Sequence, residues 1–177
     1  MCGLTRAGKS QIAEQLVPRL PAIRIRSDVA RKTLSGLSPL ASTGSSVGEG
    51  IYHPSRSDEV FTSIAEFAEA LLLGGEHVII DATFIEKSRR LAFLSLAEKL
   101  GVRAKIVYCK APIAILRQRI EKHSESNQDP SEANLDVLDA QLTKFQPPGS
   151  DEPVIEIATD RPIGDATLRS LAAAIVA

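Results

Sequence analysis

The stretch Gly3-Leu4-Thr5-Arg6-Ala7-Gly8-Lys9-Ser10 lies at the start of the sequence and matches the pattern G-x-x-x-x-G-K-[ST]. The glycines of this pattern let the backbone curl so that its N–H groups point at phosphate oxygens, and the helix that follows adds the positive end of its dipole. Lys9 brings a compact positive charge to the β- and γ-phosphates, and the Ser10 hydroxyl can bind Mg²⁺. The stretch, with Gln11 directly after it, therefore predicts a site for ATP or a similar nucleoside triphosphate.

The alternative interpretation of this stretch is a Gly-rich surface turn in front of a helix. The surrounding sequence argues against it, because short β-branched runs alternate with segments of helical periodicity. Runs rich in Ile and Val, typical of strands buried on both faces, occur at residues 22–26, 77–81, 104–109 and 154–157. Apolar residues at helical spacing predict helices at residues 9–16, 57–73, 86–100, 112–123, 131–145 and 164–176. This alternation predicts an α/β fold with a mostly parallel sheet.

Three segments are expected to be irregular. Residues 35–54 are rich in Gly, Ser and Pro, residues 124–130 are polar, and residues 146–152 contain a Pro-Pro-Gly run. A phosphate-binding loop normally follows a buried strand, yet only Met1 and Cys2 precede Gly3. We therefore expect the first strand of the sheet to be largely missing. A misplaced gene start, a fragment and a trimmed N-terminus are all open as explanations.

The amino-acid composition excludes several classes of protein. A chain of 177 residues, 44% hydrophobic and 24% charged, is typical of a single soluble globular domain. The net charge of −1 gives no electrostatic footprint for duplex DNA or a membrane surface. The sequence contains no signal-peptide pattern and no apolar run long enough to cross a bilayer. Cys2 and Cys109 form no C-x-x-C pair, so we expect a cytoplasmic protein without structural zinc.

Two aspartates follow predicted strands and are candidates for phosphoryl-transfer chemistry. Asp28 comes after the strand at 22–26, with Arg31 three residues later on the same side of a helix start. Asp28 is a candidate general base for an acceptor hydroxyl, and Arg31 a candidate ligand for an anionic group of that acceptor. Asp81 ends the strand at 77–81, which is the position of an acid that acts behind Mg²⁺. The structural alternatives are a helix cap for each aspartate and a solvated role for Arg31.

The helix predicted at 112–123 carries the cationic residues Arg117, Arg119 and His123. Transfer of a phosphoryl group needs cations on the moving group, and a closing lid is a common place to keep them. We therefore expect a lid at roughly residues 112–145. The alternative is an ordinary solvated helix face.

Taken in order, the phosphate-binding stretch, Ser27-Asp28-Val29-Ala30-Arg31-Lys32, Val78-Ile79-Ile80-Asp81-Ala82-Thr83-Phe84 and Arg117-x-Arg119 resemble predicted P-loop kinases of the AAA family. Relatives of that family are polynucleotide 5′-kinases, gluconate-type kinases and zeta-toxin kinases. The resemblance extends from Gly3 to about Pro147. It implies a three-layer P-loop NTPase sandwich with a parallel sheet in the order 2-3-1-4-5. The ATP-binding domains that this chain resembles are often fused to an aminoglycoside-phosphotransferase-like domain.

The resemblance also implies roles for single residues. Asp28 and Arg31 match the acceptor-holding Asp-x-x-Arg pair of polynucleotide kinases, and Thr83 is placed beside the acceptor. Arg119 matches the first of two lid arginines, but His123 replaces the second, and a free imidazole is mostly neutral near pH 7.

We expect an ATP- and Mg²⁺-dependent phosphotransferase that acts on a hydroxyl of a small molecule or a nucleic-acid 5′ end. A nucleotide-binding regulatory module without transfer activity is the first alternative. An ATPase that drives a partner protein is the second.

Overall fold

The structure of the chain is a computed structural model that describes residues 1–39, 41, 50–123 and 134–177. Its strands are β1 (Ala22–Arg26), β2 (His77–Asp81), β3 (Ile106–Lys110) and β4 (Val154–Ala158). Its α-helices are α1 (Lys9–Leu16), α2 (Ser27–Leu34), α3 (Pro54–Leu73), α4 (Lys87–Lys99), α5 (Ile113–His123), α6 (Leu135–Lys144) and α7 (Asp165–Val176). Two short 3₁₀ turns, η1 (Val17–Arg19) and η2 (Gly50–Tyr52), complete the elements.

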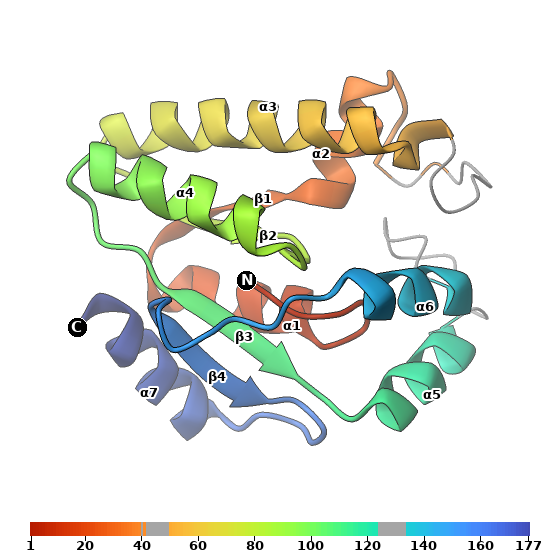
Figure 1. Cartoon of the computed structure of the whole chain (residues 1–177). Coiled ribbons are helices and arrows are strands. Elements are labelled where there is room, and N and C mark those ends of the chain that lie inside the picture. The colour runs from red at the N-terminus through yellow and green to blue at the C-terminus, as the bar shows by residue number, and fades with distance from the viewer. Residues whose placement is uncertain (40, 42–49, 124–133) are drawn as a thin grey trace.

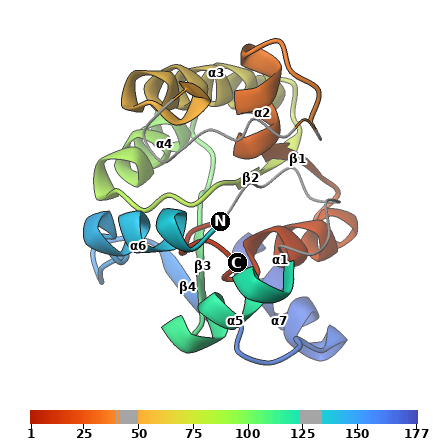
Figure 2. The ribbon, with the colours of Figure 1, turned by 90° about the vertical axis from the view of Figure 1, so that its right-hand side faces the viewer.

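The strands form two parallel pairs. β1 pairs with β2 in the register Ala22 to His77, and β3 pairs with β4 in the register Ile106 to Val154. The N-terminal residues lie between the pairs, where the amide of Cys2 donates to the Val107 carbonyl at 2.8 Å (Figure 2). On the other side, the Met1 amino group donates to the Ile80 carbonyl at 2.7 Å. The spatial order is therefore β1, β2, residues 1–3, β3 and β4, which confirms the predicted parallel sheet and its order.

The predicted central strand is reduced to these first residues. Where a longer strand would continue, a cavity of about 490 Å³ separates β2 from β3. Its lining is mainly apolar and includes Val78 and Ile80 of β2 and Ile106 of β3. Burial lowers the pKa of the Met1 amino group at the end of this cavity.

Helices cover both faces of the sheet and give the predicted three layers (Figure 1). On one face, α1 and α7 bury a cluster that includes Ile12, Leu16 and Leu171. On the other face, α3 packs Val60, Ile64 and Ala68 around Ile25 of β1. Beside them, three aromatic rings of α3, α4 and the β2–α4 segment meet edge to face, with 5.1–6.2 Å between ring centroids; they are Phe61, Phe84 and Phe93. These clusters cover the two faces of the sheet.

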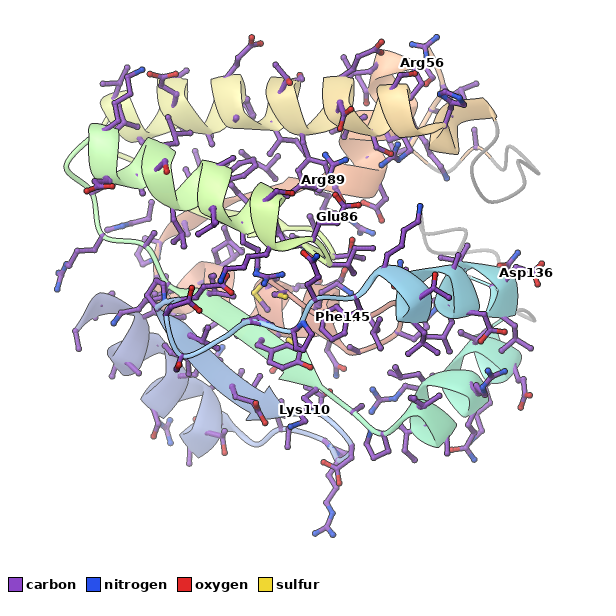
Figure 3. The ribbon with its side chains drawn as sticks, in the orientation of Figure 1. Arg56, Glu86, Arg89, Lys110, Asp136 and Phe145 are labelled. Atoms are coloured by element: carbon purple, nitrogen blue, oxygen red, sulfur yellow. The ribbon has the colours of Figure 1, made fainter. Side chains whose placement is uncertain are left out.

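After α6 the chain returns across the molecule to β4, and residues 146–152 are irregular as predicted. The ring of Phe145 packs on Tyr108 of β3 with 5.9 Å between centroids, at the end of α6 (Figure 3). The buried guanidinium of Arg90 on α4 then donates to both oxygens of Glu152, at 2.6 and 2.9 Å. This pair fixes the return segment to the sheet.

Most predicted elements agree with the structure, but their ends differ in places. The helix predicted at 57–73 begins earlier, at Pro54, because proline is favoured at the first helical position. The strand predicted at 104–109 begins at Ile106. The helix predicted at 131–145 begins at Leu135, after the N-cap Asn134, and ends at Lys144. Residues 124–133 lie outside the described residues. Among the described helices, none is long and apolar enough to cross a membrane.

Candidate functional site

The phosphate-binding stretch curls over the carboxyl end of β3. Gly3 has a φ of 137°, and a Cβ at this position would lie 2.4 Å from the Cys109 carbonyl oxygen, so the loop needs glycine here. Gly8 is the N-cap of α1 and has a φ of 79°. The first N–H groups of α1 have no partner within the helix, and the positive end of the helix dipole lies at the same place. The loop and the start of α1 thus present donors that can bind an anion such as a phosphate group.

Lys9 is buried inside this loop, with 8% of its surface exposed. Its Nζ donates to the Leu4 carbonyl at 2.7 Å, which keeps the ammonium group over the curl of the loop. Burial lowers the pKa of Lys9, and the acids around it, among them Asp81 and Asp28, oppose this effect.

Ser10 and Gln11 follow in the first turn of α1, with Ser10 half-buried and Gln11 exposed. The described residues contain no group of three His, Cys, Asp or Glu side chains that could hold a metal ion. A Mg²⁺ ion at Ser10 would thus take most of its ligands from phosphate oxygens and water, which is the usual coordination of this ion.

Asp81 ends β2 with 5% of its surface exposed. Its Oδ2 accepts hydrogen bonds from Arg24 of β1, from Nε at 3.1 Å and from Nη2 at 2.6 Å. Within the described part of the chain, no hydrogen bond to Oδ1 is found. One carboxylate oxygen is therefore held in place by the arginine, and the other can accept from a metal-bound water.

Asp28 lies in the first turn of α2 and is held by Arg26, the last residue of β1. The two side chains form a fork, with Nε to Oδ1 at 3.1 Å and Nη2 to Oδ2 at 2.7 Å. The amide of Val29 donates to Oδ1 as well, at 2.8 Å. Both oxygens of this aspartate thus have donors, and an acceptor hydroxyl must approach the remaining lone pairs.

Arg31 and Thr83, the other predicted acceptor residues, have different surroundings. Arg31 donates from Nη1 to the Ile51 carbonyl at 2.9 Å and to the Ser57 hydroxyl at 3.1 Å, which joins α2 to the start of α3. Thr83 follows β2, and its carbonyl accepts from the Gly3 amide at 3.0 Å. The structure thus brings Thr83 to the phosphate loop and turns Arg31 toward η2 and α3.

The three predicted lid residues are placed differently. Arg117 is exposed and donates to Asp139 of α6 at 2.6 Å. Arg119 donates from Nη1 to the Arg6 carbonyl at 3.1 Å and from Nη2 to the Thr159 carbonyl, so it contacts the back of the phosphate loop. His123 ends α5, but its side chain lies outside the described residues.

Sequence reasoning missed four polar residues around this site: Arg24, Arg26, Gln141 and Thr159. The two arginines alternate in a β-branched strand, Ala22-Ile23-Arg24-Ile25-Arg26, which places both on one face. That alternation, directly before Asp28, was a usable signal for paired charges. Gln141 and Thr159 contact the loop from more than a hundred residues away, at separations of 136 and 152, and no local pattern marks them.

The chain belongs to the AAA domain family, whose sequence pattern matches residues 1–148. Its fold is that of a P-loop NTPase. No match was found among curated protein sequences.

Three solved structures illustrate the similarity. Kti12 of Chaetomium thermophilum, in complex with ADP-AlF3, superposes with a TM-score of 0.74 at 16% identity, over 97% of this chain and 93% of that chain. A gluconokinase from Sinorhizobium meliloti gives 0.67 at 18% identity, over 99% and 89%. The Mycobacterium tuberculosis APS kinase CysC, in complex with AMPPNP and APS, gives 0.66 at 17% identity, over 97% and 90%. At these identities the similarity establishes the shared fold.

Proposed function

We propose that the chain is an ATP- and Mg²⁺-dependent phosphotransferase that moves a γ-phosphate to a hydroxyl of a small molecule or of a nucleic-acid 5′ end. The observation that supports this most strongly is that the phosphate loop, Asp81 and Asp28 meet at one edge of the sheet. The Gly3 amide donates to the Thr83 carbonyl at 3.0 Å, which holds the loop against the end of β2. Asp81, the last residue of β2, lies opposite Arg26 of β1, and Asp28 is paired with Arg26. The kinases among the solved structures of the same fold support the same class of reaction.

In this proposal, residues 3–11 bind the phosphates of the nucleotide. Lys9 leaves the Leu4 carbonyl, 2.7 Å from its Nζ, and binds the β- and γ-phosphates instead. The exchange replaces a hydrogen bond to a neutral carbonyl with bonds to charged oxygens, which are shorter and stronger.

Ser10 and Asp81 fit a Mg²⁺ ion at the phosphates. The Ser10 hydroxyl would bind the metal directly, and Oδ1 of Asp81 would accept from a water bound to it. When bound, Mg²⁺ would neutralise the charge that develops on the phosphates.

Asp28 acts on the acceptor hydroxyl. The fork with Arg26 fixes the carboxylate, so its remaining lone pairs can orient the hydroxyl and take up its proton. Arg31, beside the start of α3, and Thr83, at the phosphate loop, would contact other parts of the acceptor. Arg119, which contacts the loop at the Arg6 carbonyl, would act on the moving phosphoryl group.

A nucleotide-binding regulatory module without transfer activity is the second candidate. Two observations favour it: His123 stands where related kinases have a second lid arginine, and both oxygens of Asp28 already have donors. A cytoplasmic location and a fused or separate phosphotransferase-like partner domain belong to this proposal in either form.

Transfer of labelled γ-phosphate to a panel of sugars, sugar acids and 5′-hydroxyl oligonucleotides tests the proposal. We expect Asp28→Asn to reduce transfer by about a hundredfold or more, with MgATP affinity unchanged. Asp58→Asn is the matched control, because Asp58 is an exposed aspartate of α3 that is paired with Arg89. Equal loss of transfer and of nucleotide affinity in Asp28→Asn would make Asp28 structural. A parent that binds MgATP but phosphorylates no acceptor would favour the regulatory module.

A further inference from the structure

We infer that Gln141, Arg119 and Thr159 form a clamp on the phosphate loop, with contacts to three successive loop residues, and that this clamp sets nucleotide affinity. The inference rests on the proposed nucleotide site. It assigns positioning roles to residues of α5, α6 and the segment after β4.

The first contact of the clamp comes from α6. The Oε1 atom of Gln141 accepts from the backbone amide of Thr5 at 2.7 Å. Thr5 is buried, with 5% of its surface exposed, and a buried amide without a partner is costly. The Gln141 side chain therefore stabilises this turn of the loop in one conformation.

The second contact comes from α5. Arg6 adopts a φ of 56°, in the left-handed region that is unfavourable for a residue with a side chain. Such a conformation persists when the surroundings hold it, and Arg119 does so by donating from Nη1 to the Arg6 carbonyl at 3.1 Å.

The third contact comes from the segment after β4. The Thr159 hydroxyl lies 2.9 Å from the Ala7 carbonyl oxygen and 3.1 Å from the Lys110 carbonyl oxygen, and its single proton can serve either one. Thr159 is itself buried, with 4% of its surface exposed. It therefore joins the loop to the end of β3.

Three different parts of the chain thus hold three successive residues of the loop, Thr5, Arg6 and Ala7. Their contacts leave the first N–H groups of α1 to a phosphate. Because the loop is ordered before the nucleotide arrives, binding avoids part of the ordering cost. Arg117 also donates to Asp139 at 2.6 Å, so α5 and α6 are joined to each other as well as to the loop.

ADP and ATP binding by calorimetry tests the clamp in Gln141→Leu and Thr159→Val. Neither residue has been assigned a contact with nucleotide. Loss of one hydrogen bond that orders the loop should weaken the binding of ADP and of ATP alike, by about fivefold for each variant. Thr159→Ser keeps the hydroxyl and should restore affinity.

Two substitutions of the same chemistry serve as controls. Gln146→Leu removes an acceptor for the Lys87 amide at 2.8 Å, and Thr143→Val removes a hydroxyl that donates to the Ala140 carbonyl of its own helix at 2.8 Å. Neither contact involves the loop, so both controls should bind ADP as the parent does. A general loss of stability would affect controls and clamp variants alike.

Hydrogen exchange of residues 3–8 in the nucleotide-free protein gives a second readout. Exchange should be faster in Gln141→Leu than in the parent and in Gln146→Leu. If the two clamp variants bind ADP as tightly as the parent does, the clamp does not set nucleotide affinity and the inference is wrong. Weaker binding of ATP alone would also overturn it, because it would indicate contact with the γ-phosphate. If the parent binds no nucleotide, the proposed function fails, and unchanged exchange in Gln141→Leu would then reject the ordering of the loop separately.

Discussion

The phosphate loop and the acceptor side of the site, at the end of β1 and the start of α2, are built on different physical principles. In the loop, the groups that we propose to bind a ligand are main-chain N–H groups and one buried lysine, and side chains from elsewhere in the chain hold the loop. On the acceptor side, the charged side chains are paired with each other: Arg24 with Asp81 and Arg26 with Asp28. The loop thus presents its binding groups directly, whereas the acceptor side has already satisfied most of its own.

Because of this difference, the two regions select different features of a ligand. A loop that binds phosphate through its backbone N–H groups does so whatever the rest of the ligand is. The function of such a loop can therefore be predicted from a short sequence pattern. Paired charges contribute little net charge, and the acceptor must be selected by the shape of the surrounding segments and by the lone pairs left over. Substitutions should accordingly have large effects in the loop and more selective effects on the acceptor side.

The largest effect is expected for Gly3→Ala. The added Cβ would meet the Cys109 carbonyl oxygen at 2.4 Å with φ at 137°, and both atoms belong to backbone that cannot move independently. We expect the free energy of unfolding to fall by about 3 kcal/mol or more, with loss of MgATP binding.

Gly101→Ala is the control for Gly3→Ala. Gly101 also has a positive φ, 66°, but a Cβ there would meet nothing within 4 Å. Urea unfolding should show a loss of about 1 kcal/mol or less. Equal losses for the two alanines would mean that strain in φ, rather than the close approach to β3, dictates glycine in the loop.

A smaller and more selective effect is expected for the two aspartates. Asp81→Asn leaves the guanidinium of Arg24, whose side chain is 15% exposed, without its counter-ion, while Asp28→Asn affects a pair that is 24% exposed on both sides. We expect Asp81→Asn to cost about 2–3 kcal/mol of stability and Asp28→Asn about 1 kcal/mol or less.

Magnesium dependence separates the two aspartates further. Nucleotide titrations with and without Mg²⁺ should show that Asp81→Asn weakens the metal-dependent part of the affinity and that Asp28→Asn does not. A loss of metal dependence in Asp28→Asn alone would exchange the roles of the two residues.

A change in stability that appears only at alkaline pH is expected for Cys109, whose carbonyl oxygen lies next to Gly3. Burial raises the pKa of this thiol from 9.0 to about 11. A thiol whose pKa is raised by folding stabilises the native state fully below pH 9, and this contribution is lost as the pH rises through about 11. The difference in unfolding free energy between parent and Cys109→Ala should shrink by about 2 kcal/mol between pH 8 and pH 10.5. A constant difference would show that the thiol reaches solvent.

The sequence was sufficient for the framework. The spacing of apolar residues and the positions of turn-forming residues predicted both ends of β1, β2 and α1 correctly, since these segments are short, buried and bounded by turn residues. The G-x-x-x-x-G-K-[ST] pattern located the loop, because its residues are adjacent in the chain and each has a fixed backbone task.

The contacts around the loop could not be predicted in the same way. Gln141 and Thr159 contact it through folding of the whole chain, and a glutamine or threonine at these positions has no pattern of its own. The orientation of Arg119 toward the Arg6 carbonyl is likewise a tertiary result, because its place on α5 is equally compatible with a solvated face.

The most direct test of the account is thermal unfolding of the parent and of Lys9→Ala, each with and without MgATP. Nucleotide at a hundred times its dissociation constant should add about 2.7 kcal/mol, which raises the midpoint of the parent by roughly 5–10 °C. The same nucleotide should leave the midpoint of Lys9→Ala unchanged, because the β- and γ-phosphates lose their cation. An unshifted midpoint in the parent, or an equal shift in the two proteins, would contradict the assignment of residues 3–11 as the nucleotide site.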